Sequence, residues 1–187
     1  FLGGYFYGGQ LIILTGKRGQ GKSTVANLLA RFWDVDSGEI LIRGVNIKDV
    51  SLSELMSEIS MVFQRVYLFQ DTIFNNIAMG EEVIEAAKKA RCYDFIMALP
   101  DGFDTMIGEG GATLSGGEKQ RISIARCILK DAPIVVLDEA TAYADPENEH
   151  QIQKAFDGLI KNKTVIMVAH RLSTVQDADQ ILVMKNG

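Results

Sequence analysis

The stretch GKRGQGKST, residues 16–24, decides the fold because it matches the pattern GxxxxGK[ST]. It follows an apolar run at 11–15 that predicts a buried strand, and it opens a predicted helix over 22–32. Glycines in this setting let the backbone curl until several N–H groups point at phosphate oxygens, and the helix adds its positive end. The predicted phosphate and Mg²⁺ ligands are Gly16, Gly19, Gln20, Gly21, Lys22, Ser23 and Thr24, with Lys22 on the β- and γ-phosphates and Ser23 on the metal.

Outward from this loop, strand patterns alternate with helix patterns, which favours a parallel sheet covered by helices. A mostly helical stretch at 71–99, expected to break near Cys92, interrupts the alternation and predicts a separate lobe. The fold class is therefore α/β, with a mostly parallel sheet core at about 1–70 and 131–187 and an inserted helical lobe at about 71–130. The remaining expected strands or hairpins lie at 39–47, 59–63, 134–138, 164–170 and 180–184, and the remaining helices at 53–58, 116–130 and 146–160.

Polar side chains stand at the ends of three predicted strands. Asp138 and Glu139 end the run IVVLD-E, where a carboxylate reaches the crevice in which parallel sheets bind ligands. Asp138 is expected to hold Mg²⁺, directly or through water, and Glu139 to polarise an attacking water. His170 is a candidate sensor of the γ-phosphate, and Gln64 a candidate contact to Mg²⁺ or to the water. Without the phosphate loop, each of these residues is as well explained as a helix cap or a polar strand end.

The segment LSGGEKQR, residues 114–121, predicts a second helix N-terminus that could bind an anion. Ser115 is an ordinary N-cap, and Glu118 three residues later completes a capping box. Capping alone does not explain Gly116 and Gly117, because two glycines in the first turn lower helix stability.

Composition narrows the classes of function. Of the 187 residues, 47% are apolar and 23% charged, ordinary values for a soluble globular protein. The formal net charge of -5 and the lack of a basic stripe disfavour nucleic acid as the main partner. Cys92 and Cys127 stand apart from metal-type spacing and are expected to be reduced thiols of a cytosolic protein. The longest apolar runs are far too short to span a membrane.

Together these motifs resemble the ATP-binding domain of ABC transporters. LSGGEKQR is similar to the signature of that family, and the other landmarks stand in the family's order: GKRGQGKST, MVFQ, IVVLDEAT and VAHRLST. Details such as YLF at 67–69, LPDGFDT and IGEGG look like the exporter branch, in which Glu109 matches a position that faces the membrane domain. The resemblance covers nearly the whole chain and implies a P-loop NTPase fold with ATP and Mg²⁺ as ligands.

The resemblance also implies a mechanism. Two such domains pair head to tail, and each ATP lies between the phosphate loop of one chain and Ser115, Gly116 and Gly117 of the other. Glu139 would act as base, His170 as switch and Gln64 as a catalytic and metal contact, while Asp145 would connect the two sites. A transmembrane domain would be the second partner, which implies a cytoplasmic location at the inner face of the membrane. The expected activity is ATP hydrolysis that drives export of an unidentified substrate.

The chain departs from the family pattern at several points. Only fifteen residues precede Gly16, and the chain stops at Gly187, so it is expected to be truncated at both ends relative to the family. Tyr5, Phe6 and Tyr7 stand too close to the loop for the usual adenine-stacking role, which predicts weak selectivity for ATP over GTP. Two alternatives stay open: a nucleotide-binding interaction module with little turnover, and an ABC ATPase that does not serve transport.

Overall fold

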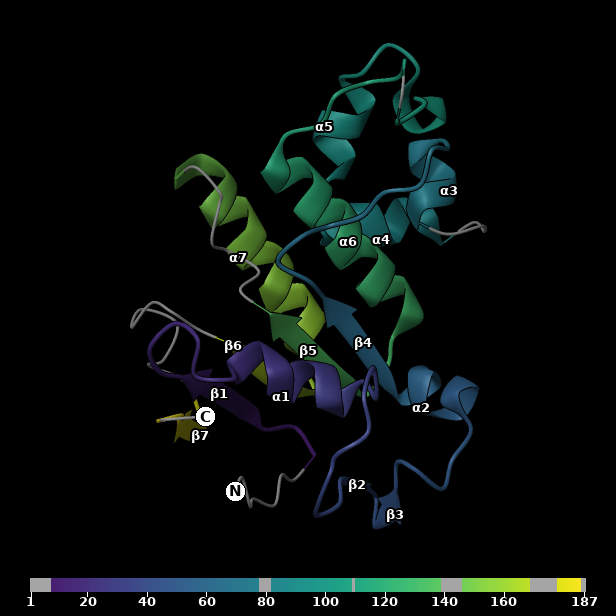
Figure 1. The fold of residues 1–187 in the computed structure, drawn as a ribbon. Helices are drawn as coiled ribbons and strands as arrows, with labels where there is room; N and C mark the ends of the chain where they lie inside the picture. Colours follow the sequence, from purple (N-terminus) through teal and green to yellow (C-terminus); the bar gives the residue numbers. More distant parts are fainter. Residues whose placement is uncertain (1–7, 78–81, 109, 139–145, 169–177, 186–187) are drawn as a thin grey trace. The chain divides into compact units, whose positions relative to one another are not determined.

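The computed structural model describes residues 8–77, 82–108, 110–138, 146–168 and 178–185 (Figure 1). The chain divides into two compact units, and each is described by itself. The first comprises residues 1–61, 132–139 and 162–187, and the second comprises residues 62–131 and 140–161. None of the described helices is long and apolar enough to cross a bilayer.

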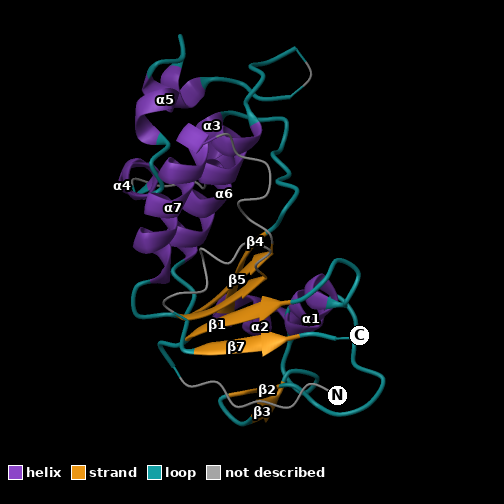
Figure 2. Ribbon diagram, turned by 90° about the vertical axis from the view of Figure 1, so that its left-hand side faces the viewer, coloured by secondary structure: helices purple, strands orange, loops and turns teal. Residues whose placement is uncertain are grey.

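A five-stranded sheet of order β4-β5-β6-β1-β7 carries the first unit (Figure 2). Its pairings of β5 with β6, β6 with β1 and β1 with β7 are parallel, as predicted. The bounds are β1 (Leu11–Thr15), β4 (Ile59–Val62), β5 (Ile134–Asp138), β6 (Thr164–Val168) and β7 (Gln180–Val183).

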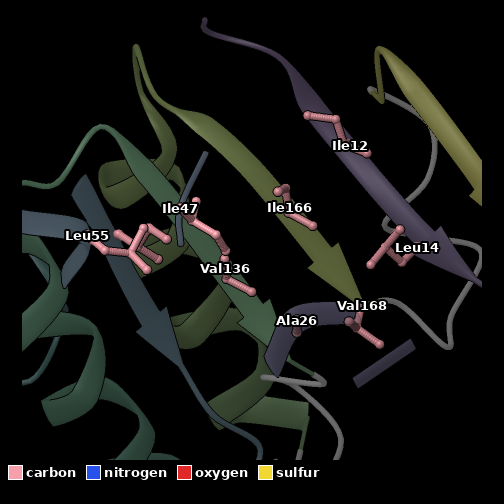
Figure 3. Packing of buried hydrophobic residues seen from close by; sticks show 9 residues of the cluster. Ile12, Leu14, Ala26, Ile47, Leu55, Val136, Ile166 and Val168 are labelled. Atoms are coloured by element: carbon pink, nitrogen blue, oxygen red, sulfur yellow. The ribbon is translucent and has the colours of Figure 1, made fainter. Parts of the chain in front are cut away.

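One hydrophobic cluster of the first unit lies on one face of this sheet. Register places Ile12 beside Ile166 and Leu14 beside Val168, and Val136 beside Ile166, so these side chains form cross-strand rows. Helix α1 (Lys22–Leu29) packs on β5 and β6 and buries Ala26 against the rows, as Figure 3 shows. This packing places the first turn of α1 beside the carboxyl end of β5.

Helix α1 ends three residues earlier than predicted. Arg31 has a left-handed φ of 55°, which stops the helix just after Ala30. The Arg31 guanidinium then donates to the carbonyls of Ile47 and Val50 at 2.8 and 3.0 Å. Trp33, the only tryptophan of the chain, follows this turn and is 63% exposed.

Beyond α1, the first unit continues with the predicted hairpin and short helix. The hairpin pairs β2 (Leu41–Ile42) with β3 (Val45–Asn46) in antiparallel fashion. The helix is α2 (Leu52–Glu58), which begins with a capping box between Ser51 and Glu54.

The second unit is helical. Its elements are α3 (Ile73–Ile77), α4 (Val83–Lys89), α5 (Tyr93–Met97), the 3₁₀ turn η1 (Gly102–Asp104), α6 (Gly116–Lys130) and α7 (Pro146–Ile160). The predicted break near Cys92 is confirmed, because Arg91 has a φ of 56° and separates α4 from α5. Helix α6 packs against α3, α4 and α7. By these contacts α7 groups with the helical unit, whereas the predicted division placed residues 131–187 in the sheet core.

Both cysteines are buried and free, as predicted for reduced thiols. Burial raises the pKa of the Cys92 thiol to about 12, and its Sγ contacts the Ala87 carbonyl at 3.4 Å. A thiol with so high a pKa stays protonated and unreactive near neutral pH. Cys92 therefore acts as a small apolar side chain of the helical unit.

Candidate functional site

The loop between β1 and α1 has the backbone that its glycines predict. Gly19 and Gly21 both have φ of 81°, in the left-handed region that only glycine adopts without cost. At Gly16, φ is 142° and a Cβ would lie 2.5 Å from the carbonyl oxygen of Met184, just beyond β7. The neighbouring strand thus leaves room for glycine alone. The loop is held close to the sheet and leads directly into the N-terminus of α1.

Lys22, the first residue of α1, turns back into this loop. Its side chain is only 4% exposed, and Nζ donates to the carbonyl oxygens of Gly16 at 3.0 Å and Lys17 at 2.9 Å. These carbonyls satisfy the ammonium as hydrogen-bond acceptors but bring no negative charge. A phosphate at the helix N-terminus would supply that charge, in an environment where charge-assisted bonds are strong.

Ser23 lies beside the carboxylate at the end of β5. Its Oγ donates to Oδ1 of Asp138 at 2.9 Å, so the structure brings together two of the three predicted metal ligands. Mg²⁺ is bound by oxygens at about 2.0–2.1 Å in an octahedron, in which adjacent ligands are about 2.9 Å apart. The two oxygens therefore fit neighbouring positions around one Mg²⁺ ion. No group of three or more acidic, histidine or cysteine side chains in the described part of the chain forms a competing metal site.

Replacing Asp138 by Asn tests this ligand pair. The amide can still accept the Ser23 hydrogen bond but has no charge for the cation. We expect the Mg²⁺ concentration that half-maximally tightens binding of a fluorescent ATP analogue to rise about tenfold, equivalent to about 1.4 kcal/mol. Titrating Mg²⁺ at fixed nucleotide measures the shift. Asp49→Asn, at an exposed position of the same unit, is the control. Equal Mg²⁺ dependence in both variants would exclude Asp138 as a ligand.

The second anion site predicted from sequence is the start of α6. Ser115 is its N-cap, and the capping box with Glu118 is complete: Glu118 N donates to Ser115 Oγ at 3.3 Å, and Ser115 N donates to Glu118 Oε2 at 2.7 Å. The structure also accounts for both glycines. A Cβ on Gly116 would meet nothing within 4 Å, whereas one on Gly117 would lie 2.7–2.9 Å from the side chain of Asn148. Gly116 therefore leaves open space above the first turn, and Gly117 lets α6 pack tightly on α7.

These two glycines offer a matched pair of substitutions. Gly117→Ala should lower the free energy of unfolding by about 1–3 kcal/mol, because the methyl group overpacks the contact with Asn148. Gly116→Ala should instead be neutral or stabilise by up to about 1 kcal/mol, since alanine favours a helix and meets no neighbour. Urea unfolding of both variants measures the difference. The cost at Gly117 should shrink in an Asn148→Gly background, which removes the clashing Cβ as well as the amide, and an unchanged cost there would contradict the assigned clash.

For the other predicted site residues, the structure gives only burial and position, or does not describe the residue. Gln64 follows β4 by two residues instead of ending it and is half-buried in the second unit. Gln20 is half-buried and Thr24 exposed in and after the loop. Glu109, Glu139, Asp145 and His170, with the aromatic residues 5–7, lie outside the described residues, so their roles stay predictions.

Sequence reasoning missed the polar side chains that hold α6 in place. Arg121, which is 6% exposed, donates from Nη1 to Oδ1 of Asn148 and lies 5.1 Å over the ring of Phe95. Arg126 of the same helix forms a second, partly buried contact with Asn76 of α3. Arg121 ends the motif LSGGEKQR, but the sequence pattern does not identify the partners of these residues, because the partners are far apart in the chain and meet only in the folded unit.

A parallel sheet, a glycine-rich loop entering a helix, a buried loop lysine and a serine–aspartate pair define a P-loop nucleotide-binding protein. The comparisons with known proteins narrow this class. The family model of the ABC transporter matches residues 2–142. The chain therefore belongs to the ABC transporter family, and the predicted P-loop fold is confirmed.

Several similar proteins are named as flippases or exporters. The chain is 53% identical over 186 residues to the ATP-dependent lipid A-core flippase of Haemophilus influenzae (strain 86-028NP), covering 96% of this chain and 32% of the flippase. It is 51% identical over 185 residues to the putative multidrug export ATP-binding/permease protein YgaD of Bacillus subtilis (strain 168). The solved structure of a bacterial Atm1-family ABC exporter with ATP bound matches with a TM-score of 0.87 and 45% identity, over 96% of this chain and 32% of that one. The chain thus spans about a third of the length of these relatives.

Proposed function

We propose that this chain binds and hydrolyses ATP as the nucleotide-binding domain of an ABC exporter. The observation that carries the proposal is the pair of Ser23 and Asp138, 2.9 Å apart beside a buried lysine at a helix N-terminus. The similarity to exporters supports coupling of hydrolysis to export, although the cargo is not defined by residues of this chain.

The residues of the loop would have separate roles in binding the nucleotide and the metal. Backbone N–H groups from Gly16 to Gly21 and the positive end of α1 hold the phosphates, and Lys22 exchanges its carbonyl partners for phosphate oxygens. Ser23 and Asp138 hold Mg²⁺, which when bound neutralises charge that develops on the phosphates. Glu139 would orient and deprotonate the attacking water, with His170 and Gln64 as further contacts to it and to the γ-phosphate.

A second copy of such a domain would complete the site. Ser115, Gly116 and Gly117 of one chain would face the γ-phosphate bound to the loop of the other in a head-to-tail dimer, with Asp145 between the two sites. The capped, open first turn of α6 supports this role, because Gly116 leaves its backbone uncovered. The other proposed partner is the transmembrane domain of the transporter, which would hold this domain at the cytoplasmic face of the membrane.

The concentration dependence of phosphate release tests the proposal. If two chains build each site, phosphate release per chain should rise about tenfold as the protein concentration crosses the dissociation constant of the dimer, since a composite site exists only in the dimer. A coupled assay at saturating Mg-ATP measures this, with the Glu139→Gln variant as the background. ATP binding without phosphate release above that background at any concentration would favour a binding module without turnover.

A further inference from the structure

The stretch between β4 and α3 carries two large side chains in water. Tyr67 is 79% exposed and Phe69 is 74% exposed, in a part of the backbone with neither helix nor strand. Backbone of this kind keeps one conformation only where other groups bond its N–H and C=O groups. In this unit two side chains, Asn76 of α3 and Arg126 of α6, supply part of that bonding.

Arg126 of α6 donates from three nitrogens, one of them to this stretch and two to Asn76 of α3. Nη1 donates to the Tyr67 carbonyl at 2.8 Å, Nη2 donates to Asn76 Oδ1 at 2.7 Å, and Nε donates to the Asn76 carbonyl. The guanidinium also lies 5.6 Å over the ring of Phe69. A planar fork of donors is needed for this arrangement, and lysine, with one ammonium group, cannot reproduce it.

The side chain of Asn76 is hydrogen-bonded to backbone groups of the same stretch. The residue is only 2% exposed. Its Oδ1 accepts a hydrogen bond from Phe69 N at 2.8 Å, and its Nδ2 donates to the carbonyls of Phe69 and Thr72, both at 2.9 Å. With Arg126 on the same oxygen, donors and acceptors of this buried amide are bonded. Residues 67–77, named here the aromatic segment, are thereby fixed both internally and to α6.

The aromatic segment is also bonded to the chain that leads into α6. Ile73 N donates to the Thr105 carbonyl at 3.0 Å, and Ile107 N donates to the Asp71 carbonyl at 2.9 Å. Eight residues after Ile107 stands Ser115, the N-cap of α6. The aromatic segment therefore contacts the C-terminal half of α6, through Arg126, and also the chain that precedes the first turn of α6.

We propose that Arg126 is a positioning residue that ties the aromatic segment to α6, so that the position of Tyr67 and Phe69 sets that of Ser115 and Gly117. A helix is stiff over the ten residues between Gly116 and Arg126, about 15 Å, so a displacement at Arg126 moves the first turn with it. The effect of that movement on ATP hydrolysis rests on the proposed function, whereas the mechanical link between Arg126 and the first turn of α6 does not.

Arg126→Lys tests the link, because it keeps the charge and removes the fork. We expect amide hydrogen exchange at residues 119–123 to become at least about tenfold faster, with residues 11–29 unchanged. Affinity of the isolated chain for a fluorescent ATP analogue should stay within about twofold, since the phosphate loop belongs to the other unit, while phosphate release at saturating ATP falls about tenfold. Arg91→Lys, the same change at an exposed arginine of this unit, is the control and should match the wild type.

A second variant guards against a trivial loss of folding. Asn76→Ala should speed exchange at 119–123 in the same way, and the double variant should be less than additive because the two side chains act through one contact. Equal acceleration at 11–29 and 119–123, or none at 119–123, overturns the proposal. A wild-type chain that releases no phosphate would refute the proposed function, and the exchange result would still decide the role of Arg126.

Discussion

Replacing Lys22 by Ala is expected to weaken Mg-ATP binding by about 100- to 1000-fold. The ammonium is buried and already bonded to two oxygens, so it meets a bound nucleotide without first being ordered. Charge-assisted hydrogen bonds of this kind contribute about 1.5–3 kcal/mol each; two of them to phosphate oxygens, less the two carbonyl bonds that Lys22 gives up, leave a loss of about 3–4 kcal/mol. Equilibrium titration with a fluorescent ATP analogue measures the change.

The control for Lys22 is Lys89, an exposed lysine on α4. Lys89→Ala makes the same change in net charge, so it separates a local contact from a general electrostatic effect. Circular dichroism of both variants checks that the fold is retained. An affinity of the Lys22→Ala variant within threefold of the control would mean that nucleotide does not bind at this loop.

Replacing Glu139 by Gln is expected to lower phosphate release by about 100- to 10,000-fold, the usual contribution of a general base. The residue follows Asp138 directly in the sequence, and Asp138 ends β5 with its carboxylate beside Ser23. Because the amide cannot accept the proton of the attacking water, ATP should stay bound without being cleaved. Affinity for Mg-ATP should therefore equal that of the wild type or exceed it.

Two measurements on the same samples test this expectation: steady-state phosphate release and retention of ATP after rapid gel filtration. Glu39→Gln, at an exposed position in the first unit, is the matched control and should release phosphate like the wild type. If the Glu139 variant and its control hydrolyse ATP at one rate, another group activates the water and the proposed mechanism is wrong.

The sheet and the phosphate loop could be predicted because short, local sequence patterns determine them. The strand over 11–15 and the helix start at Lys22 follow from hydrophobicity and from the motif, and both are confirmed. The end of α1 could not be predicted, because it depends on Arg31, whose side chain bonds carbonyls of Ile47 and Val50 that are distant in sequence.

The same distinction holds for the candidate site. The types of residue in GKRGQGKST and IVVLD predicted that Ser23 and Asp138 would serve one metal ion, and the fold brings these residues to hydrogen-bonding distance. The requirement for glycine at position 117 could not be predicted, because the close contact with Asn148 arises only when α6 and α7 pack. Asn76 and Arg126 were missed for the same reason, because a tertiary contact between polar side chains leaves no periodic pattern.

Trp33 gives the chain an optical property of its own. An indole that is mostly in water before unfolding changes its surroundings little when the chain unfolds. Intrinsic tryptophan emission should therefore follow a melt of this protein poorly, and the ellipticity of its helices is the better signal. For the same reason the emission is accessible to a soluble quencher in the native state, so a fall in quenching on addition of another molecule would report directly that the end of α1 had been covered.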